Sequence, residues 1–211
     1  NIDRMAAAGM KFTQHYAGST VCAPTRCSLL NGVHTGHAYV RGNREVQPEG
    51  QAPIPADLIT IPKLLKKAGY TTGMFGKWGL GAPGSDGDPV KQGWDEFYGY
   101  HCPRQAHTFY PKHLWHNDKK VILDGKTYSH DLIQNMALQF IRDNAKKPFF
   151  AYLPITIPHA AMQCPEEDAA PFRKKFKQFE NKIGKYSHGT KVRNPVAAFA
   201  GMMTRMDRGI G

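Results

Sequence analysis

The sequence predicts an α/β fold with a mostly parallel central sheet flanked by helices. Two segments carry this prediction, because in each an amphipathic helix is followed by a short apolar strand. The first pairs a helix at residues 60–69 with a strand at residues 70–75. The second pairs a helix around residues 133–141 with a strand at residues 149–153. Repeated helix-to-strand alternation is typical of parallel sheets covered by helices.

The remaining elements are expected in order along the chain. Residues 2–9 have the apolar spacing of a helix, and residues 10–17 alternate partly in the manner of a strand. A helix is predicted to begin at Cys22 and to run to about Gly32. The Gly- and Pro-rich residues 33–59 predict a long irregular loop.

Apolar side chains recur at helical spacing in two further segments. In the first helix-to-strand unit the predicted core face is Ile61, Leu64, Leu65 and Ala68. Near the end of the chain, a stripe at helical spacing predicts a helix: Val196, Phe199, Ala200, Met203, Met206 and Ile210. Between the two units, residues 81–129 are rich in Gly, Pro, His and aromatic residues, so we expect a loop-rich insertion over the sheet edge.

The chain is strongly basic, with 28 Lys and Arg against 17 Asp and Glu and a net charge of +11. This balance favours acidic partners such as sulfated sugars, nucleic acid or anionic surfaces. Basic and aromatic residues interleave at residues 172–186, but a solvated helix face explains them and no nucleic-acid motif accompanies them, so no nucleic-acid partner is predicted. No run of 18 apolar residues predicts a membrane span.

The four cysteines are Cys22, Cys27, Cys102 and Cys164, a number that permits two disulfides in an oxidising compartment. A zinc site around residues 101–107 is not predicted, because one cysteine with irregularly spaced histidines lacks the paired spacing of zinc ligands.

Residues 22–26 read Cys-Ala-Pro-Thr-Arg and lead into an apolar segment. Pro24 suits the first position of a helix, which places Cys22 at or just before a helix N-terminus. That end of a helix favours negative charge, and Arg26 adds a positive charge on the same face. The pattern predicts an anion site, with simple burial of the Cys22 thiol as the alternative.

Two further polar motifs follow the predicted strands, where ligands gather in open α/β sheets. Lys77 lies between glycines that let the backbone turn tightly and hold a cation against an anion. His159 follows the strand at residues 149–153 and is a candidate acid, or else a histidine that only forms hydrogen bonds.

Together, the Cys-x-Pro-x-Arg motif at 22–26, Gly-Lys-Trp at 76–78 and Pro-His at 158–159 resemble, in order, the motifs of the sulfatase family. The resemblance covers nearly the whole chain. It implies an alkaline-phosphatase-like sandwich and hydrolysis of a sulfate ester of a carbohydrate, including sulfated polysaccharide, or of an aryl alcohol. It further implies that residues 1–211 are an internal part of an N-terminal catalytic domain, without its first strand and its C-terminal portion, in a periplasmic or secreted protein.

The resemblance also implies residue roles. A maturation enzyme would oxidise Cys22 to formylglycine, whose hydrate attacks sulfur and binds Ca²⁺ or Mg²⁺. Arg26 would hold this group, Lys77 would bind the sulfate or the hydrate, and His159 would contact the sulfate or protonate the leaving alcohol. The remaining metal ligands and a further substrate lysine are expected outside residues 1–211, so this segment alone is expected to be inactive.

One departure concerns Gly79, which stands where much of the family has a histidine after Lys-Trp. His107 resembles a histidine found in a subgroup of sulfatases with this glycine. We predict that His107 occupies the vacated space and binds substrate; an exposed or aromatic-packed histidine is the alternative.

Two other functions stay open from the sequence. One is a phosphoester or phosphonate-ester hydrolase of the same superfamily. The other is a catalytically inactive module that binds sulfated polysaccharide, which the +11 charge and Gly79 suggest. Arg41, Asn43 and Arg44 could line an entrance for an acidic substrate, with a solvated loop as the alternative.

Overall fold

The computed structural model describes residues 1–187 and 189–211, and the chain forms two compact units. The larger unit comprises residues 17–106 and 110–155, and the smaller one comprises residues 1–16, 107–109 and 156–211. Each unit has its own packing and is described by itself.

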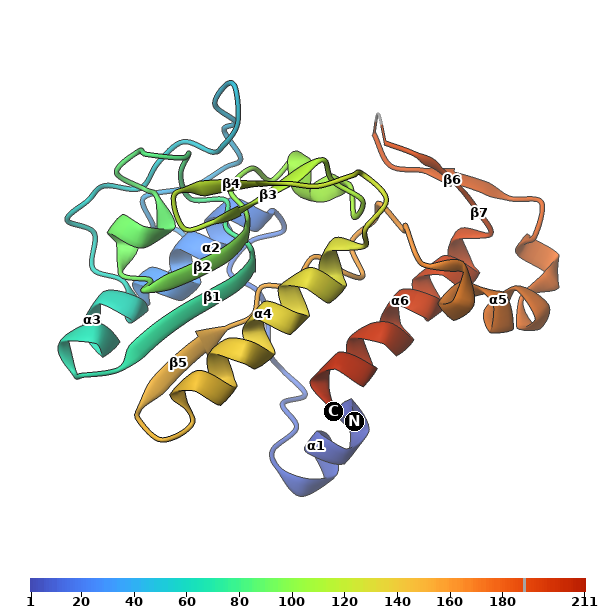
Figure 1. Cartoon of the computed structure of the whole chain (residues 1–211), viewed down its shortest axis with the longest axis horizontal. Coiled ribbons are helices and arrows are strands. Elements are labelled where there is room, and N and C mark those ends of the chain that lie inside the picture. Colours follow the sequence, from blue (N-terminus) through green and yellow to red (C-terminus); the bar gives the residue numbers. More distant parts are fainter. Residues whose placement is uncertain (188) are drawn as a thin grey trace. The chain divides into compact units, whose positions relative to one another are not determined.

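The larger unit is built on a five-stranded sheet (Figure 1). Its elements, with η2 ending in the smaller unit, are α2 Cys22–Asn31, α3 Ile61–Lys67, β1 Thr71–Lys77, η1 Pro89–Gln92, β2 Glu96–Tyr100, η2 Gln105–His107, β3 His113–His116, β4 Lys119–Ile122, α4 Ser129–Asn144 and β5 Phe149–Tyr152. The strand order is β4-β3-β2-β1-β5. β1 pairs in parallel with β2 and β5, and β3 and β4 join antiparallel. Both predicted helix-to-strand units and the α/β fold are confirmed.

Helices cover both faces of this sheet. Met74 and Phe97 join the buried cluster beneath α2, whereas Phe75 and Tyr98 join a second cluster with Phe140 of α4. Successive side chains of a strand point to opposite faces, so α2 and α4 lie on opposite sides of the sheet.

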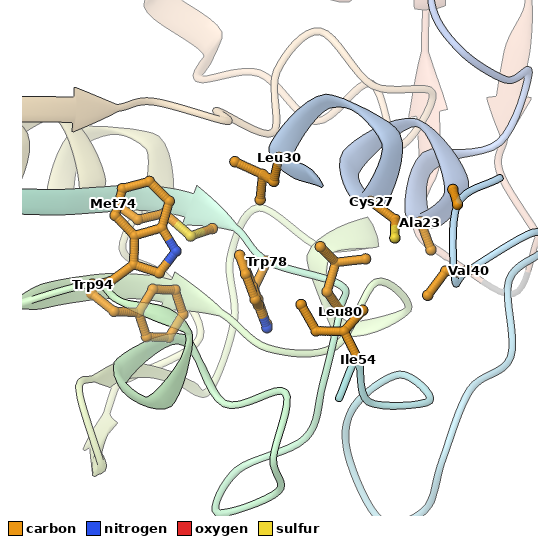
Figure 2. Packing of buried hydrophobic residues seen from close by; sticks show 11 residues of the cluster. Ala23, Cys27, Leu30, Val40, Ile54, Met74, Trp78, Leu80 and Trp94 are labelled. Atoms are coloured by element: carbon orange, nitrogen blue, oxygen red, sulfur yellow. The ribbon is translucent and has the colours of Figure 1, made fainter. Parts of the chain in front are cut away.

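The cluster beneath α2 anchors the helix that carries the Cys22 motif. Figure 2 shows Ala23, Cys27 and Leu30 projecting from α2 into the same buried cluster as Trp78 and Leu80. None of these five side chains is more than 2% exposed. Fully burying a side chain of this size contributes roughly 1.5–3 kcal/mol, so the position of α2 on the sheet is well determined.

Two glycines allow the strands beside Lys77 to approach closely. Gly76 has φ +140°, and a Cβ there would lie 2.3 Å from the Pro154 carbonyl oxygen. Gly99 has φ +154°, and a Cβ there would lie 1.8 Å from the Gly76 oxygen. Neither position accepts a side chain without moving backbone, so these glycines define the carboxyl end of β1.

The smaller unit is mainly helical. Its elements are α1 Ile2–Ala8, α5 Glu166–Lys175, η3 Lys177–Phe179, β6 Ile183–Lys185, β7 Lys191–Arg193 and α6 Pro195–Ile210. The α5 and α6 helices pack together around Asp168, which pairs with Arg205 and, at 3.0 Å, with Arg208. The Asn1 amino group lies 3.0 Å from the Asp207 carboxylate, so α1 is tied to the end of α6 (Figure 1).

The prediction of a strand at residues 10–17 is wrong, because this segment is neither helix nor strand. A strand needs a backbone partner, and no described strand pairs with this segment. Its large side chains are solvated: Phe12 is 70% exposed and Tyr16 is 79% exposed. Pro24 also differs from expectation, since it is the third residue of α2 and Cys22 is the first.

The core face predicted for α3 is also wrong, whereas the helix predicted near the end of the chain is confirmed as α6. In α3 only Pro62 is buried, and Leu64 is 53% exposed. In α6 the buried residues are Ala197, Ala198, Gly201 and Met202. Close helix packing explains this face: a Cβ on Gly201 would lie 2.7 Å from the Cys164 sulfur, so the small residues face inward.

Residues 81–129 are more regular than expected. They contain β2, β3 and β4, and β2 lies inside the sheet rather than over its edge. Among the described residues, none of the helices combines the length and the hydropathy that crossing a membrane requires.

Candidate active site

Cys22 begins α2 and is half-buried, and the helix end it occupies is capped from far along the chain. The preceding residue, Val21, has no side-chain oxygen to cap the helix. Asn43 supplies it instead: its Oδ1 accepts a hydrogen bond from the Ala23 N–H at 3.1 Å and lies 3.6 Å from the Cys22 sulfur. The sequence did not predict this contact for Asn43. The only local signal was that Val21 cannot cap a helix.

Lys77 is the last residue of β1, and its side chain is buried in the larger unit. Its backbone N–H donates to the Pro154 oxygen at 2.9 Å, and the Trp78 N–H donates to the Tyr100 oxygen at 2.8 Å. The ammonium is close enough to Cys22 for the two groups to shift each other's pKa. Burial lowers the pKa of Lys77; the negative charge of Cys22 opposes this effect, and Arg26 adds to it.

Arg26 lies on the turn of α2 that follows Cys22 and joins the helix to the sheet. Its Nη1 donates to the Lys77 carbonyl oxygen at 2.6 Å. Its Nε is buried and has no hydrogen-bond partner. Burial lowers the pKa of Arg26, and the nearby Tyr152 of β5 and Cys22 act in the opposite direction. A buried N–H without a partner costs roughly 1–3 kcal/mol, a cost that a bound anion would remove.

The surroundings of Cys22 favour a negative charge. Burial alone raises the pKa of the Cys22 thiol, but the positive charge of Lys77, the hydrogen bond with Asn43 and the charge of Arg26 together bring it below its usual value. The α2 N-terminus acts in the same direction. Any oxyanion formed at position 22 would be stabilised by the same groups.

His159 and His107 come together in the smaller unit. Their rings stack with centroids 4.7 Å apart and an interplanar angle of 17°. Tyr186 packs edge-on against both rings, at 4.9 Å from His107 and 5.1 Å from His159. Tyr186 follows β6, and no sequence pattern had connected it with either histidine.

Gly79 has φ +83°, which disfavours any side chain there. A Cβ at this position would lie 3.3 Å from Pro103 Cγ and 3.7 Å from Arg26 Cδ. The space beside Gly79 is therefore bounded by Pro103 and Arg26. That His107 takes the place of a histidine at this position stays a prediction.

The four cysteines are free thiols, so the two disulfides that the sequence permits are not formed. Within residues 1–187 and 189–211, no group of three or more His, Cys, Asp or Glu side chains could hold a metal ion. The described residues therefore do not make up a metal site by themselves.

The chain matches the family described as Sulfatase over residues 1–211. N-acetylgalactosamine-6-sulfatase from Rattus norvegicus is 34% identical over 183 residues, which cover 76% of this chain and 34% of that protein. Arylsulfatase from Hemicentrotus pulcherrimus is 33% identical over 184 residues, which cover 76% of this chain and 33% of that protein. The chain thus spans about a third of the length of these curated relatives.

Solved structures share the fold. The structure of Ps i-CgsB in complex with k-i-k-neocarrahexaose superposes with a TM-score of 0.79 and 28% identity, over 100% of this chain and 47% of that one. The structure of BT4656 in complex with D-Glucosamine-2-N, 6-O-disulfate gives a TM-score of 0.66 and 25% identity, over 88% of this chain and 35% of that one.

Proposed function

The chain belongs to the sulfatase family, and on that premise we propose that the Cys22 site serves the hydrolysis of a sulfate ester in the whole protein. One observation carries the proposal: a half-buried Cys22 at the start of α2 is held against the Lys77 ammonium and the Asn43 amide, with a lowered thiol pKa. A sulfated carbohydrate is the proposed substrate, because two related structures contain carbohydrate ligands. An aryl sulfate is the simplest sulfate ester that can replace this carbohydrate in an activity assay.

Membership of the family implies formylglycine at the active site, and we assign it to Cys22, which a maturation enzyme would oxidise. When present, this group would supply a hydrated aldehyde, whose hydroxyls provide a nucleophile for sulfur and a way to release the sulfate. The surroundings of position 22 fit this use, since they favour a negative charge on the side chain at this position.

The other residues have roles that follow from their contacts. Lys77 stabilises negative charge at position 22 and on the sulfate oxygens, because its ammonium is buried and its charge already acts on residue 22. Arg26 fixes α2 against the carboxyl end of β1 and offers its buried Nε–H to the anion. His159 protonates the leaving alcohol, and His107, stacked on it, binds the substrate.

Membership of the family implies a metal ion as well, and we propose Ca²⁺, or Mg²⁺, because both prefer hard oxygen ligands. Since the described residues form no metal site, no step is assigned to it. Residues 1–211 are proposed to be part of an N-terminal catalytic domain, with the segment 81–129 inserted between its two helix-to-strand units, in a periplasmic or secreted enzyme.

The proposal is tested by turnover of p-nitrophenyl sulfate by the whole protein, produced together with a formylglycine-generating enzyme. Cys22→Ala removes the nucleophile and is expected to lower kcat by about 10⁴-fold or more. Cys27→Ala is the matched control, because Cys27 lies on the same helix but points into the buried cluster (Figure 2). Cys27→Ala is expected to keep kcat within about 3-fold, since it changes packing only.

Two results would contradict the proposal. If Cys22→Ala keeps its turnover, Cys22 is not the nucleophile. If the native protein cleaves p-nitrophenyl phosphate with a higher kcat/KM than the sulfate, the phosphoester alternative is correct. Binding of sulfated polysaccharide with an unmodified Cys22 and no hydrolysis would instead identify an inactive binding module.

A further inference from the structure

A cavity of about 560 Å³ opens in the larger unit along the loop that follows α2. Most of its lining comes from one run of residues, 39–44, and the rest from Ala52 and Pro53. Its volume falls within the range of ligand pockets, roughly 300–1,000 Å³. Arg41, Asn43 and Arg44, which the sequence offered as the lining of an entrance for an acidic substrate, all line this cavity.

The cavity is positively charged. Arg41 and Arg44 both line it, and among the described residues neither guanidinium forms an ion pair with a carboxylate. The two nearest acidic residues in the sequence are already engaged: Glu45 pairs with Arg104 at 2.5 Å, and Glu49 bonds to His113 at 2.9 Å. Two uncompensated arginines in one cavity favour an anionic ligand, because guanidinium groups bind sulfate and carboxylate in a bidentate manner.

The cavity and the Cys22 site share a residue. Asn43 lines the cavity, and the same side chain caps α2 and lies 3.6 Å from the Cys22 sulfur. Val40, also in the lining, is buried in the cluster with Ala23, next to which Figure 2 shows it. The cavity is thus fixed to the start of α2 at two points.

The lining also offers a surface suited to a sugar ring. Tyr39 is 61% exposed, and Pro53 lines the same cavity. Aromatic faces and proline rings bury the apolar face of a sugar while its hydroxyls stay in water. A cavity with two arginines and an exposed tyrosine matches a sugar that carries a negative charge.

We propose that this cavity binds an anionic sugar residue adjoining the sulfate ester that is cleaved at Cys22, with Arg41 and Arg44 binding its sulfate or carboxylate and Tyr39 packing on its ring. The inference rests on the proposed sulfatase function and adds a substrate class: oligosaccharides with a second anionic group near the cleaved ester. Arg41 and Arg44 are then specificity residues.

The test measures binding by isothermal titration calorimetry to the whole protein carrying Cys22→Ala, so that no turnover is needed. The probes are three oligosaccharides of equal length: a sulfated dextran, an oligogalacturonate and a neutral dextran. We expect binding of at least one anionic probe and none of the neutral one. Arg41→Gln and Arg44→Gln are each expected to raise its Kd by about 10-fold or more, whereas Arg41→Lys and Arg44→Lys keep part of the affinity. The anionic probe that binds more tightly shows whether sulfate or carboxylate is preferred.

Arg142→Gln is the matched control, because Arg142 is exposed on α4 and its loss changes the net charge equally. The inference is overturned if the Arg41 and Arg44 variants bind like the parent, if Arg142→Gln weakens binding as much, or if the neutral probe binds as well as the charged ones. Arginine-dependent binding in a protein that hydrolyses no sulfate ester would retain the anionic-sugar site, remove the cleaved ester beside it and refute the proposed function. Sulfate ester hydrolysis together with binding that does not depend on Arg41 or Arg44 would refute this inference and leave the proposed function standing.

Discussion

The Cys22 cluster of the larger unit and the His159 cluster of the smaller unit are held in different ways. In the first, Cys22, Arg26 and Lys77 are fixed by the start of a buried helix and the end of a paired strand, and they interact through charge. In the second, His107 ends the short 3₁₀ helix η2, His159 lies in a bend and Tyr186 follows β6, and their rings pack together.

This difference separates two tasks. Backbone pairing on both sides of Lys77 and the glycines at 76 and 99 leave little freedom at the anion site, which suits groups that must be in place before the reaction starts. None of the three residues of the ring stack lies in a strand, and we expect the stack to adjust to different leaving alcohols. Substitutions in the first cluster should therefore cost more activity than those in the second.

After Cys22→Ala, Lys77→Met should have the largest effect. Removing the buried ammonium is expected to lower kcat/KM for p-nitrophenyl sulfate by roughly 10³-fold. The melting temperature should stay the same or rise, since a buried charge is replaced by an apolar side chain of similar length. Lys67→Met, on the exposed end of α3, serves as the control. A loss of less than 10-fold for Lys77→Met would remove the contrast between the clusters.

The histidine pair should have a smaller effect. His159→Ala is expected to lower kcat by about 10²-fold through loss of proton transfer, and His107→Ala by about 10-fold. His107→Phe keeps a ring for the stack but has no N–H donor, so it should lose as much activity as His107→Ala. Unchanged turnover of His107→Ala would refute a substrate-binding role, and recovery in His107→Phe would show that His107 acts by packing alone.

The smallest expected effect is on the reactivity of the unmodified Cys22 thiol. In protein made without the maturation enzyme, the lowered pKa of Cys22 means that more thiolate is present at a given pH, so alkylation by iodoacetamide should reach half its maximal rate below the pH of an ordinary thiol. Lys77→Met should move this midpoint upward. Cys164 is the internal control, because burial and nearby carboxylates raise its pKa to about 12 and it should stay unreactive. An unmoved Cys22 midpoint in Lys77→Met would show that Lys77 does not act on Cys22.

The sequence predicted those parts of the fold that depend on local spacing. The helix from Cys22 to Asn31 and the helix-to-strand units that place Lys77 in the sheet are confirmed. Strand β2 was not predicted, because Gly99, which has φ +154° and closely approaches β1, makes Glu96–Tyr100 look like loop sequence. The buried face of α6 was missed because close packing of two helices selects small residues rather than large apolar ones.

The candidate site was predictable to the extent that its residues lie in short motifs. Motifs placed Cys22 and Arg26 on one helix, but contacts between distant segments carry no local signal. Asn43 reaches Cys22 from 21 positions along the chain, and Tyr186 meets His159 only after the smaller unit has folded. Such contacts depend on how loops close, which periodicity does not encode.

Mass spectrometry of the tryptic peptide of residues 12–26 tests whether Cys22 is converted to formylglycine, since Cys22 is the one cysteine in this peptide. In the whole protein, produced together with a formylglycine-generating enzyme, we expect this peptide to be lighter than its cysteine form and to react with a hydrazide. Cys22→Ala should abolish that reaction. An unmodified, alkylatable thiol at residue 22 in a preparation that hydrolyses sulfate esters would contradict the proposed conversion.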